Sequence, residues 1–364
     1  MMMIKKYLKN ELSLPEVLKA APNLVYNFFS LLYKSQNNRG PVFLTWVLTD
    51  KCQLKCKHCL RESIPSSLSK KDKLNIAKKI ADSSAYWISI TGGEPFIVPE
   101  LMDIVKILKR KNKKVTITTN GFLLDNFLKD LIDVGLDAIH LSVDSHKREV
   151  HDFLRDCPGL FDKIVKIISE IKIKRKKKPL IKLRCTISKA NYLQMSDYVK
   201  FWQDKVDSIH FQPIVNDRMN RTREKSLMFV KEDEKPFRDV LLKLQQHSIF
   251  RNKYYDLMPE FIFNRNQLCK SLNYKCLLMA SSGIYLLPNG DATVCYGRKE
   301  YVVGDILTES IVDIWAKKNT MDIRKKIVNI YSKSHCKDCF CWGPNTQFNL
   351  YLLSLYNFFN RKTK

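Results

Sequence analysis

The chain has 364 residues, which is enough for two or three domains, or for one barrel with an appendage. Its hydrophobic fraction of 45% supports a sizeable core. No stretch reaches the roughly 18 continuous apolar residues that a membrane span needs. The formal net charge of +26 raises the question of nucleic acid binding. However, the charge is spread along the chain without a recognition motif, and the basic run at 172–178 is interpreted as a solvated helix end.

The first 13 residues carry lysines but lack the apolar region and the small-residue cleavage site of a secretory signal. We therefore expect the protein in the cytoplasm. Its eleven cysteines would stay reduced there, which favours metal ligation over a disulfide framework.

Strands and helices alternate between residues 42 and 213. The predicted strands cover residues 43–48, 86–91, 114–119, 138–143, 181–187 and 208–212. The predicted helices cover residues 70–83, 99–110, 123–134, 161–173 and 195–203, where apolar residues recur at helical spacing. Such alternation indicates parallel βαβ units. Six units fit an incomplete barrel or a doubly wound sheet, and periodicity alone does not decide between the two.

Three cysteines follow the first predicted strand with the spacing C-x3-C-x2-C, namely Cys52, Cys56 and Cys59. Three thiolates on one loop can hold three irons of a [4Fe–4S] cluster and leave the fourth iron without a protein ligand. An open coordination site distinguishes a reacting metal centre from a structural one. A zinc site that includes His58 is the competing interpretation, although zinc usually takes four closed ligands.

Polar or glycine-rich turns follow the next three predicted strands. They contain Gly92, Gly93, Glu94 and Pro95 after the second strand, Thr119 and Asn120 at the third, and Ser142 and Asp144 at the fourth. Parallel α/β folds bind ligands at the carboxyl ends of their strands. Glycines allow close backbone approach, whereas any of the four polar residues could instead cap a helix.

The cysteine motif and these turns together resemble the radical S-adenosylmethionine (radical SAM) enzymes over residues 42–213. The resemblance implies an α/β fold, a partial (βα)6 TIM-like barrel, whose [4Fe–4S] cluster is held by the three cysteines. It further implies S-adenosylmethionine on the open iron. The cofactor-binding residues would be Gly92, Gly93, Glu94 and Pro95 at the methionine amino group, and Thr119, Asn120, Ser142 and Asp144 near the ribose and the carboxylate.

A second cysteine set resembles the SPASM and twitch iron–sulfur domains. Cys276 is followed by 13 residues, Gly290, four residues and Cys295, and the segment between the cysteines reads as a hairpin that turns at Asn-Gly. Downstream, Cys336, Cys339 and Cys341 are spaced C-x2-C-x-C, which is shorter than the full SPASM pattern. We therefore expect one auxiliary [4Fe–4S] cluster that uses four of these five cysteines. A zinc ion held by the last three is the alternative.

Composition shifts divide the chain into five predicted segments. They are an N-terminal helical extension (1–41), the radical SAM core (42–213), a helical connector (214–265), a small cysteine-rich α+β domain (266–345) and a C-terminal helix (346–364). Residues 17–33 and 348–359 are rich in Leu, Phe and Tyr. They are interpreted as helices that close the open edge of the barrel, with peripheral membrane contact as the alternative.

The resemblance implies a reaction as well as a fold. A one-electron donor such as flavodoxin or ferredoxin would reduce the cluster, and cleavage of S-adenosylmethionine would give a 5′-deoxyadenosyl radical that takes hydrogen from a substrate. A peptide or protein is the leading substrate class, followed by a small molecule. Two alternatives are an RNA-modifying or RNA-binding iron–sulfur protein and a membrane-associated enzyme acting on a lipid precursor. No general base can be assigned.

Overall fold

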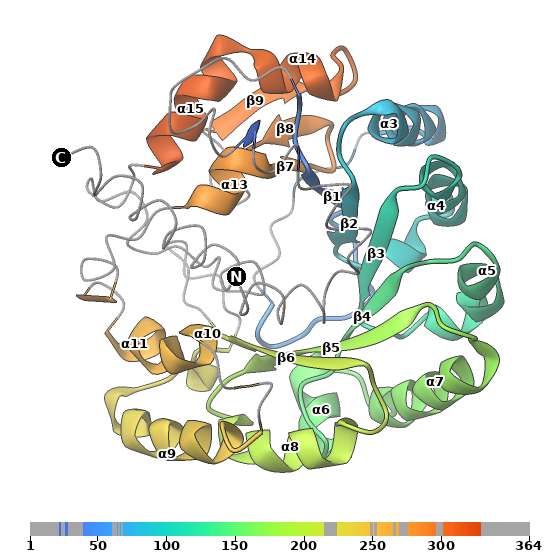
Figure 1. Cartoon of the computed structure of the whole chain (residues 1–364). Coiled ribbons are helices and arrows are strands. Elements are labelled where there is room, and N and C mark those ends of the chain that lie inside the picture. The colour runs from blue at the N-terminus through green and yellow to red at the C-terminus, as the bar shows by residue number, and fades with distance from the viewer. Residues whose placement is uncertain are drawn as a thin grey trace.

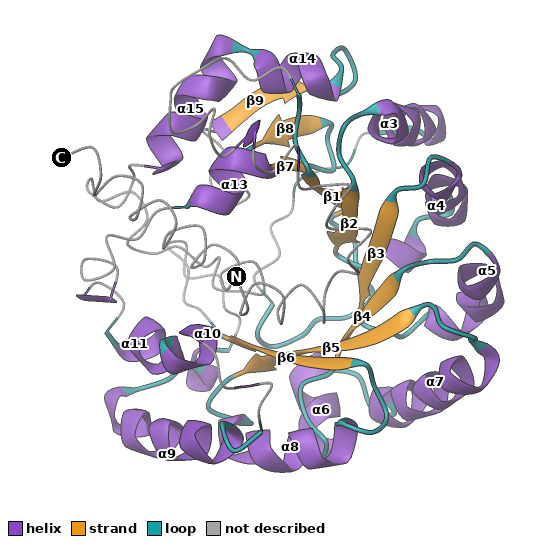
Figure 2. Ribbon diagram, in the orientation of Figure 1, coloured by secondary structure: helices purple, strands orange, loops and turns teal. Residues whose placement is uncertain are grey.

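The structure is a computed structural model of the whole chain. It describes residues 22, 26–27, 39–59, 64, 66, 68–214, 224–247, 250, 253–264, 267–268, 276–295 and 301–328. Within these residues, one curved sheet carries helices on its outer side (Figures 1 and 2).

Nine strands build the sheet in the described residues. They are β1 (Phe43–Thr49), β2 (Trp87–Gly92), β3 (Lys114–Thr119), β4 (Ala138–Ser142), β5 (Leu180–Ile187), β6 (Ser208–Pro213), β7 (Gly283–Leu286), β8 (Asp291–Thr293) and β9 (Val302–Asp305). Their spatial order is β6-β5-β4-β3-β2-β1-β7-β8-β9. Strands β1 to β6 are parallel neighbours in chain order, so their carboxyl ends share one edge.

Helices connect the strands and cover the convex face of the sheet (Figure 1). Between the barrel strands run α3 (Lys70–Asp82), α4 (Leu101–Arg110), α5 (Leu128–Asp133), α6 (Arg148–Arg155), α7 (Leu160–Lys174) and α8 (Met195–Trp202). After β6 come α9 (Glu234–Leu244), α10 (Lys253–Asp256) and α11 (Met258–Phe263), and the last part holds α13 (Leu277–Ser282), α14 (Ile311–Ala316) and α15 (Lys318–Val328). Short 3₁₀ turns η1 (Pro95–Ile97), η2 (Leu124–Phe127), η3 (Tyr192–Gln194), η4 (Lys225–Leu227) and η5 (Lys231–Asp233) link some of them.

Alternation along β1 shows why the sheet has an apolar outer face. Leu44, Trp46 and Leu48 are buried in the same core as Ile76 and Ile80 of α3. Burial of such side chains stabilises the fold by removing apolar surface from water. Strand residues alternate between the two faces, so Thr45 and Thr49 share the other face with Phe43 and Val47.

The predicted strands and most predicted helices between residues 42 and 213 are confirmed within a few residues. Helix α6 was not predicted, because it holds few apolar residues and buries the polar side chains of His151 and Arg155 instead. The helix predicted at 123–134 is divided into η2 and α5, and Phe127, the last residue of η2, has a φ of −118° at the junction.

The predicted hairpin after Cys276 is confirmed as β7 and β8, which pair antiparallel. Its place in the fold was not predicted. Strand β7 lies parallel to β1, with Phe43 opposite Gly283 and Trp46 opposite Leu286, so the hairpin continues the barrel sheet. Lys79 of α3 reinforces this junction, since its Nζ donates to the carbonyls of Ile306, Leu307 and Glu309 at 2.6, 2.9 and 3.0 Å. The boundaries of the five segments stay predictions.

The basic run at 172–178 is partly engaged in holding the end of α7. Lys172 donates to the Asp204 carbonyl at 2.6 Å, Arg175 pairs with Asp207 at 2.6 Å, and Lys178 pairs with Asp137. The interpretation of this run as a helix end is therefore correct.

Most of the two aromatic segments at 17–33 and 348–359 lies outside the described residues. None of the described helices combines the length and the apolar character that crossing a membrane requires.

Asp137, at the opposite end of the strands from the site, offers a test of the fold. Its buried carboxylate accepts from the Val115 N–H at 2.8 Å and pairs with Lys109 and Lys178. Burial alone would raise the pKa of Asp137, but these partners lower it below its usual value. The stability that it contributes is therefore present above the unfolded pKa of about 3.9 and is lost as the pH falls through the lower folded value.

We expect Asp137→Asn to lower the free energy of unfolding by about 1–3 kcal/mol at pH 7. In urea unfolding, its deficit against the parent should shrink as the pH falls below 4. Asp162→Asn is the matched control, since Asp162 forms an exposed pair with Arg148 and should change stability by less than about 0.5 kcal/mol. A deficit of the same size at pH 7 and pH 3 contradicts this account.

Candidate active site

A cavity of about 270 Å³ lies where the parallel strands end. The three cysteines of the first motif, His58 and Arg155 contribute to its wall. Its other polar lining comes from the ends of five strands, namely Thr91, Gly92, Gly93, Thr118, Thr119, Asn120, Ser142, Thr186 and Gln212. This position agrees with the rule that parallel α/β folds bind ligands at the carboxyl edge of the sheet.

Hydrogen bonds within the cysteine loop (residues 52–59) and to neighbouring elements hold the loop in place. Cys59 N–H donates to the Cys56 carbonyl at 3.2 Å, and Lys57 N–H donates to the Leu154 carbonyl of α6 at 3.0 Å. Asn120 at the end of β3 points its amide Nδ2 at the Cys52 sulfur, 3.6 Å away. Cys56 is buried, and the other two cysteines are half-buried. The loop therefore presents its thiols from a fixed backbone.

The glycines of the second turn hold this loop in place. Gly93 N–H donates to the Thr49 carbonyl at 2.7 Å, and Glu94 N–H donates to the Lys51 carbonyl at 2.9 Å. A Cβ on Gly92 would lie 2.3 Å from the Thr49 oxygen, and one on Gly93 would lie 2.0 Å from the Lys51 oxygen. Only glycine permits this backbone approach, and Gly92 also has a φ of +137°.

Glu94 does not line the cavity. Its side chain is fully buried, where it accepts hydrogen bonds from Phe96 N–H at 3.1 Å, Thr119 Oγ1 at 2.8 Å and Asn120 N–H at 2.9 Å. Burial raises the pKa of Glu94, and these hydrogen bonds only partly oppose the rise. The carboxyl group thus fastens the end of β2 to the end of β3. Pro95 follows it in η1 and is buried as well.

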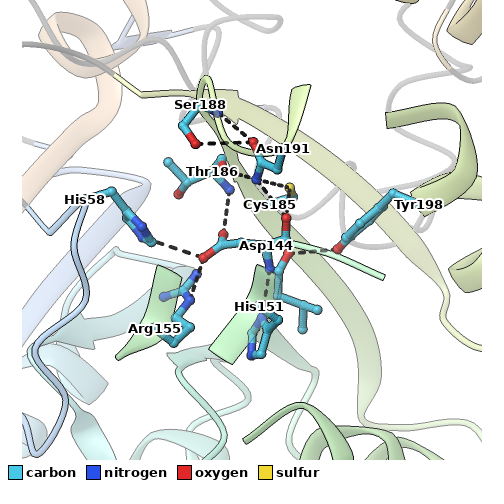
Figure 3. A network of polar contacts seen from close by, with 10 residues as sticks. His58, Asp144, His151, Arg155, Cys185, Thr186, Ser188, Asn191 and Tyr198 are labelled. Atoms are coloured by element: carbon cyan, nitrogen blue, oxygen red, sulfur yellow. Dashed lines mark hydrogen bonds and ion pairs between the residues drawn. The ribbon is translucent and has the colours of Figure 1, made fainter. Parts of the chain in front are cut away.

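Asp144 is likewise absent from the cavity wall, and Figure 3 shows the residues that surround it. Its carboxylate is fully buried and accepts from Thr186 N–H at 2.9 Å. The other oxygen is 2.6 Å from Arg155 Nε and 3.7 Å from His58 Nε2. Burial alone would raise the pKa of Asp144, but the positive charge of Arg155 lowers it. Burial lowers the pKa of His58 to about 4, so this imidazole is neutral at pH 7.

The donor set fits a cluster better than a single ion. In the described part of the chain, no group of three or more His, Cys, Asp or Glu side chains is arranged to hold one metal ion. His58 faces Asp144. Thiolates that bind different irons of a [4Fe–4S] cluster need no common centre, and the three thiols border one cavity.

The cavity contains residues that the sequence reasoning missed. Arg155 lines it from α6, and Thr186 and Gln212 line it from the ends of β5 and β6. The strand-end rule that selected Asn120 would also have found Thr186 and Gln212. Arg155 gave no such signal, because its helix was not predicted.

The C-terminal cysteines are described only in part. Cys276 precedes α13 and Cys295 follows β8, and both are half-buried against the core. Cys295 N–H donates to Thr293 Oγ1 at 3.2 Å, which fixes its backbone. Cys336, Cys339 and Cys341 lie outside the described residues.

Protein-family models match both the barrel that carries the first cysteine motif and the C-terminal cysteine region. The model of the radical SAM superfamily matches residues 46–187, and that of the SPASM iron–sulfur cluster-binding domain matches residues 276–340. The chain therefore contains a radical SAM domain followed by a C-terminal SPASM domain. The radical SAM domain accordingly implies a [4Fe–4S] cluster and S-adenosylmethionine as cofactors. The SPASM domain implies auxiliary iron–sulfur clusters.

Curated relatives match to different extents. The subtilosin biosynthesis protein AlbA of Bacillus subtilis is 26% identical over 285 residues, which are 76% of this chain and 59% of AlbA. The tungsten-containing aldehyde ferredoxin oxidoreductase cofactor-modifying protein of Pyrococcus furiosus is 24% identical over 82% of this chain and 86% of its own length. A GTP 3′,8-cyclase of Chlorobaculum tepidum is 38% identical over only 28% of this chain and 32% of its own. The chain spans 30% to 59% of the first three curated relatives.

Solved structures share the fold. SuiB of Streptococcus suis bound to precursor peptide SuiA has a TM-score of 0.62 at 19% identity, over 86% of this chain and 73% of SuiB. The structure of anSMEcpe with AdoMet and the Cp18Cys peptide has a TM-score of 0.58 at 15% identity, over 88% of this chain and 98% of that chain. The predicted α/β partial barrel with a cysteine-rich appendage is thereby confirmed.

Glu94→Gln tests the carboxylate behind the turn. Either orientation of the amide places its NH₂ against a backbone N–H, of Asn120 or of Phe96. We expect a loss of about 1–3 kcal/mol in unfolding free energy, together with weaker S-adenosylmethionine binding in equilibrium titrations. Glu149→Gln, at an exposed position on α6, is the control. Unchanged stability and binding in Glu94→Gln would show that the buried carboxyl does not hold the strand ends.

Proposed function

We propose that this chain uses its cluster to cleave S-adenosylmethionine reductively and to abstract a hydrogen atom from a peptide or protein substrate. The observation that carries the proposal is that three cysteine thiols share one cavity with the polar ends of β2 to β6. When bound, the cluster and S-adenosylmethionine supply a 5′-deoxyadenosyl radical once an electron has been delivered.

The residues of the chain have separate tasks in this proposal. Cys52, Cys56 and Cys59 would hold three irons of the cluster and leave one open to the methionine amino and carboxylate groups. Backbone carbonyls of Gly92 and Gly93 would accept from the N–H groups of that amino group, since both glycines border the cavity.

The remaining strand ends bind the rest of the cofactor. Thr119, Asn120 and Ser142 offer hydroxyl and amide groups to the ribose and the carboxylate. Glu94, Pro95 and Asp144 support these groups from behind. Leu54, Pro213 and Ile214 add apolar surface to the wall, which helps to keep water from a reactive intermediate.

One long match and two fold neighbours favour a peptide over a nucleotide substrate. The match to AlbA, a bacteriocin biosynthesis protein, covers 76% of this chain and that to the Pyrococcus cofactor-modifying protein covers 82%, whereas the match to the GTP cyclase covers 28%. Two fold neighbours have been solved with peptides bound. By analogy with these proteins, a peptide is the substrate class that we propose.

The C-terminal domain adds a second iron–sulfur site to the proposal. One auxiliary cluster would use four of Cys276, Cys295, Cys336, Cys339 and Cys341. If all its irons are bound by cysteine, it relays an electron from the substrate radical; an open iron would instead bind the substrate. We also propose a cytoplasmic location and a flavodoxin or ferredoxin as the electron donor.

The alternatives have less support. The basic run at 172–178 is partly occupied with partners of its own fold, which weakens the case for a nucleic acid surface. A lipid substrate was suggested by the aromatic segments, most of which lie outside the described residues.

Transfer of deuterium identifies the substrate class. Extract from cells grown in heavy water is separated into peptide, nucleotide and lipid fractions. Each fraction is incubated anaerobically with the reduced enzyme and unlabelled S-adenosylmethionine. Hydrogen abstraction moves deuterium into 5′-deoxyadenosine, which mass spectrometry measures. We expect enrichment from the peptide fraction at least tenfold above that from the other two.

Two variants control this experiment. Cys56→Ala removes a cluster ligand and should lower the release of 5′-deoxyadenosine by a factor of about 10³ or more relative to the parent. Cys157→Ala makes the same chemical change outside the motif and should keep parental activity. Enrichment from nucleotides or lipids alone rules out the peptide substrate, and undiminished cleavage by Cys56→Ala rules out the proposed cluster.

A further inference from the structure

Given the proposed cluster at Cys52, Cys56 and Cys59, on which this inference rests, we propose a second role for the site. The buried pair of Asp144 and Arg155 sets the reduction potential of that cluster through the charge that it places beside Cys56. In this role Asp144 is a positioning residue, which acts through Arg155 and makes no contact with cofactor or substrate.

The guanidinium of Arg155 is paired with the Asp144 carboxylate and borders the cavity that the cysteine thiols line. Arg155 Nε lies 2.6 Å from Asp144 Oδ2, and the side chains of Arg155 and Asp144 are 8% and 0% exposed. Arg155 and Cys56 border the same cavity. Arg155 thus places a buried positive charge between the cavity and the end of β4.

Three further hydrogen bonds fix Asp144, one at its carboxylate and two at its backbone (Figure 3). Thr186 N–H of β5 donates to its Oδ1 at 2.9 Å. The backbone of Asp144 is held as well, because its N–H donates to His151 Nδ1 at 3.2 Å and its carbonyl accepts from Asn191 Nδ2 at 2.7 Å. Asp144 therefore cannot follow the guanidinium if that group moves, and it determines where the guanidinium stays.

Buried charges at this distance act strongly, because little water screens them. Arg155 carries a positive charge at the cavity that Cys56 lines, and Asp144 carries a negative charge directly behind it. Reduction adds one negative charge to the cluster. A positive neighbour favours that step and a negative neighbour opposes it, and both net charge and hydrogen bonds to sulfur are known controls of cluster potential. The two residues should therefore shift the potential in opposite directions.

The test is a redox titration of the first cluster by electron paramagnetic resonance, without S-adenosylmethionine. At a fixed potential, Arg155→Gln should lower the ratio of reduced to oxidised cluster at least tenfold. Asp144→Asn, which keeps an acceptor for Thr186, should raise that ratio at least tenfold. For a one-electron couple each tenfold change is a shift of 59 mV. The double variant should return to within threefold of the parent.

Two further variants separate placement from total charge. Arg155→Lys keeps the charge and should change the ratio less than Arg155→Gln does. Lys55→Gln removes the same charge from an exposed position in the same loop, and should change the ratio less than twofold. If Asp144→Asn does not fold, the comparison of Arg155→Lys with Arg155→Gln decides the matter, and equal ratios overturn the proposal.

The outcomes distinguish this inference from the proposed function. Iron and sulfide are measured in every variant. A parent chain that assembles no cluster at the first motif overturns the proposed function and this inference with it. The other case is a parent chain that assembles its cluster normally. If Arg155→Gln and Asp144→Asn then both leave the ratio of reduced to oxidised cluster unchanged, or both shift it in the same direction, only this inference is overturned.

Discussion

The site depends on the close approach of two backbones where β1 and β2 end. The Thr49 and Lys51 carbonyls accept from Gly93 and Glu94 N–H, and the space for these contacts exists only because neither Gly92 nor Gly93 has a side chain. A loop of eight residues that carries three cysteines begins at this junction. Without the junction the thiols would have no fixed position relative to the ends of β3 and β4. The glycine pair is thus a structural requirement of the cysteine loop as well as part of the cavity wall.

Two buried carboxyl groups connect the ends of neighbouring strands. Glu94 ties the end of β2 to that of β3, and Asp144 ties the end of β4 to β5, α6 and the cysteine loop. Burying a carboxyl group is costly unless hydrogen bonds or charged partners compensate for the lost water. Glu94 and Asp144 each have several such partners. The strand ends are therefore held from behind, while the smaller polar groups face the cavity.

The sequence predicted the parts of this arrangement that have a strong local pattern. Apolar alternation located the six barrel strands, and the cysteine spacing located the loop between β1 and α3. The roles of Glu94 and Asp144 could not be predicted, because a motif shows that a residue is present but not which way its side chain points. Helix α6 was missed since it buries His151 and Arg155 in place of an apolar stripe. The parallel pairing of β7 with β1 joins strands about 240 residues apart, which no local pattern reveals.

The central claim is that the cysteine loop leaves one iron of the cluster open to S-adenosylmethionine. Electron–nuclear double resonance on the reduced cluster tests it directly, with S-adenosylmethionine carrying ¹⁷O in its carboxylate and, separately, ¹⁵N in its amino group. The account predicts a resolved hyperfine coupling from both labels in the parent chain. A reduced cluster that shows coupling to neither label at saturating S-adenosylmethionine contradicts it.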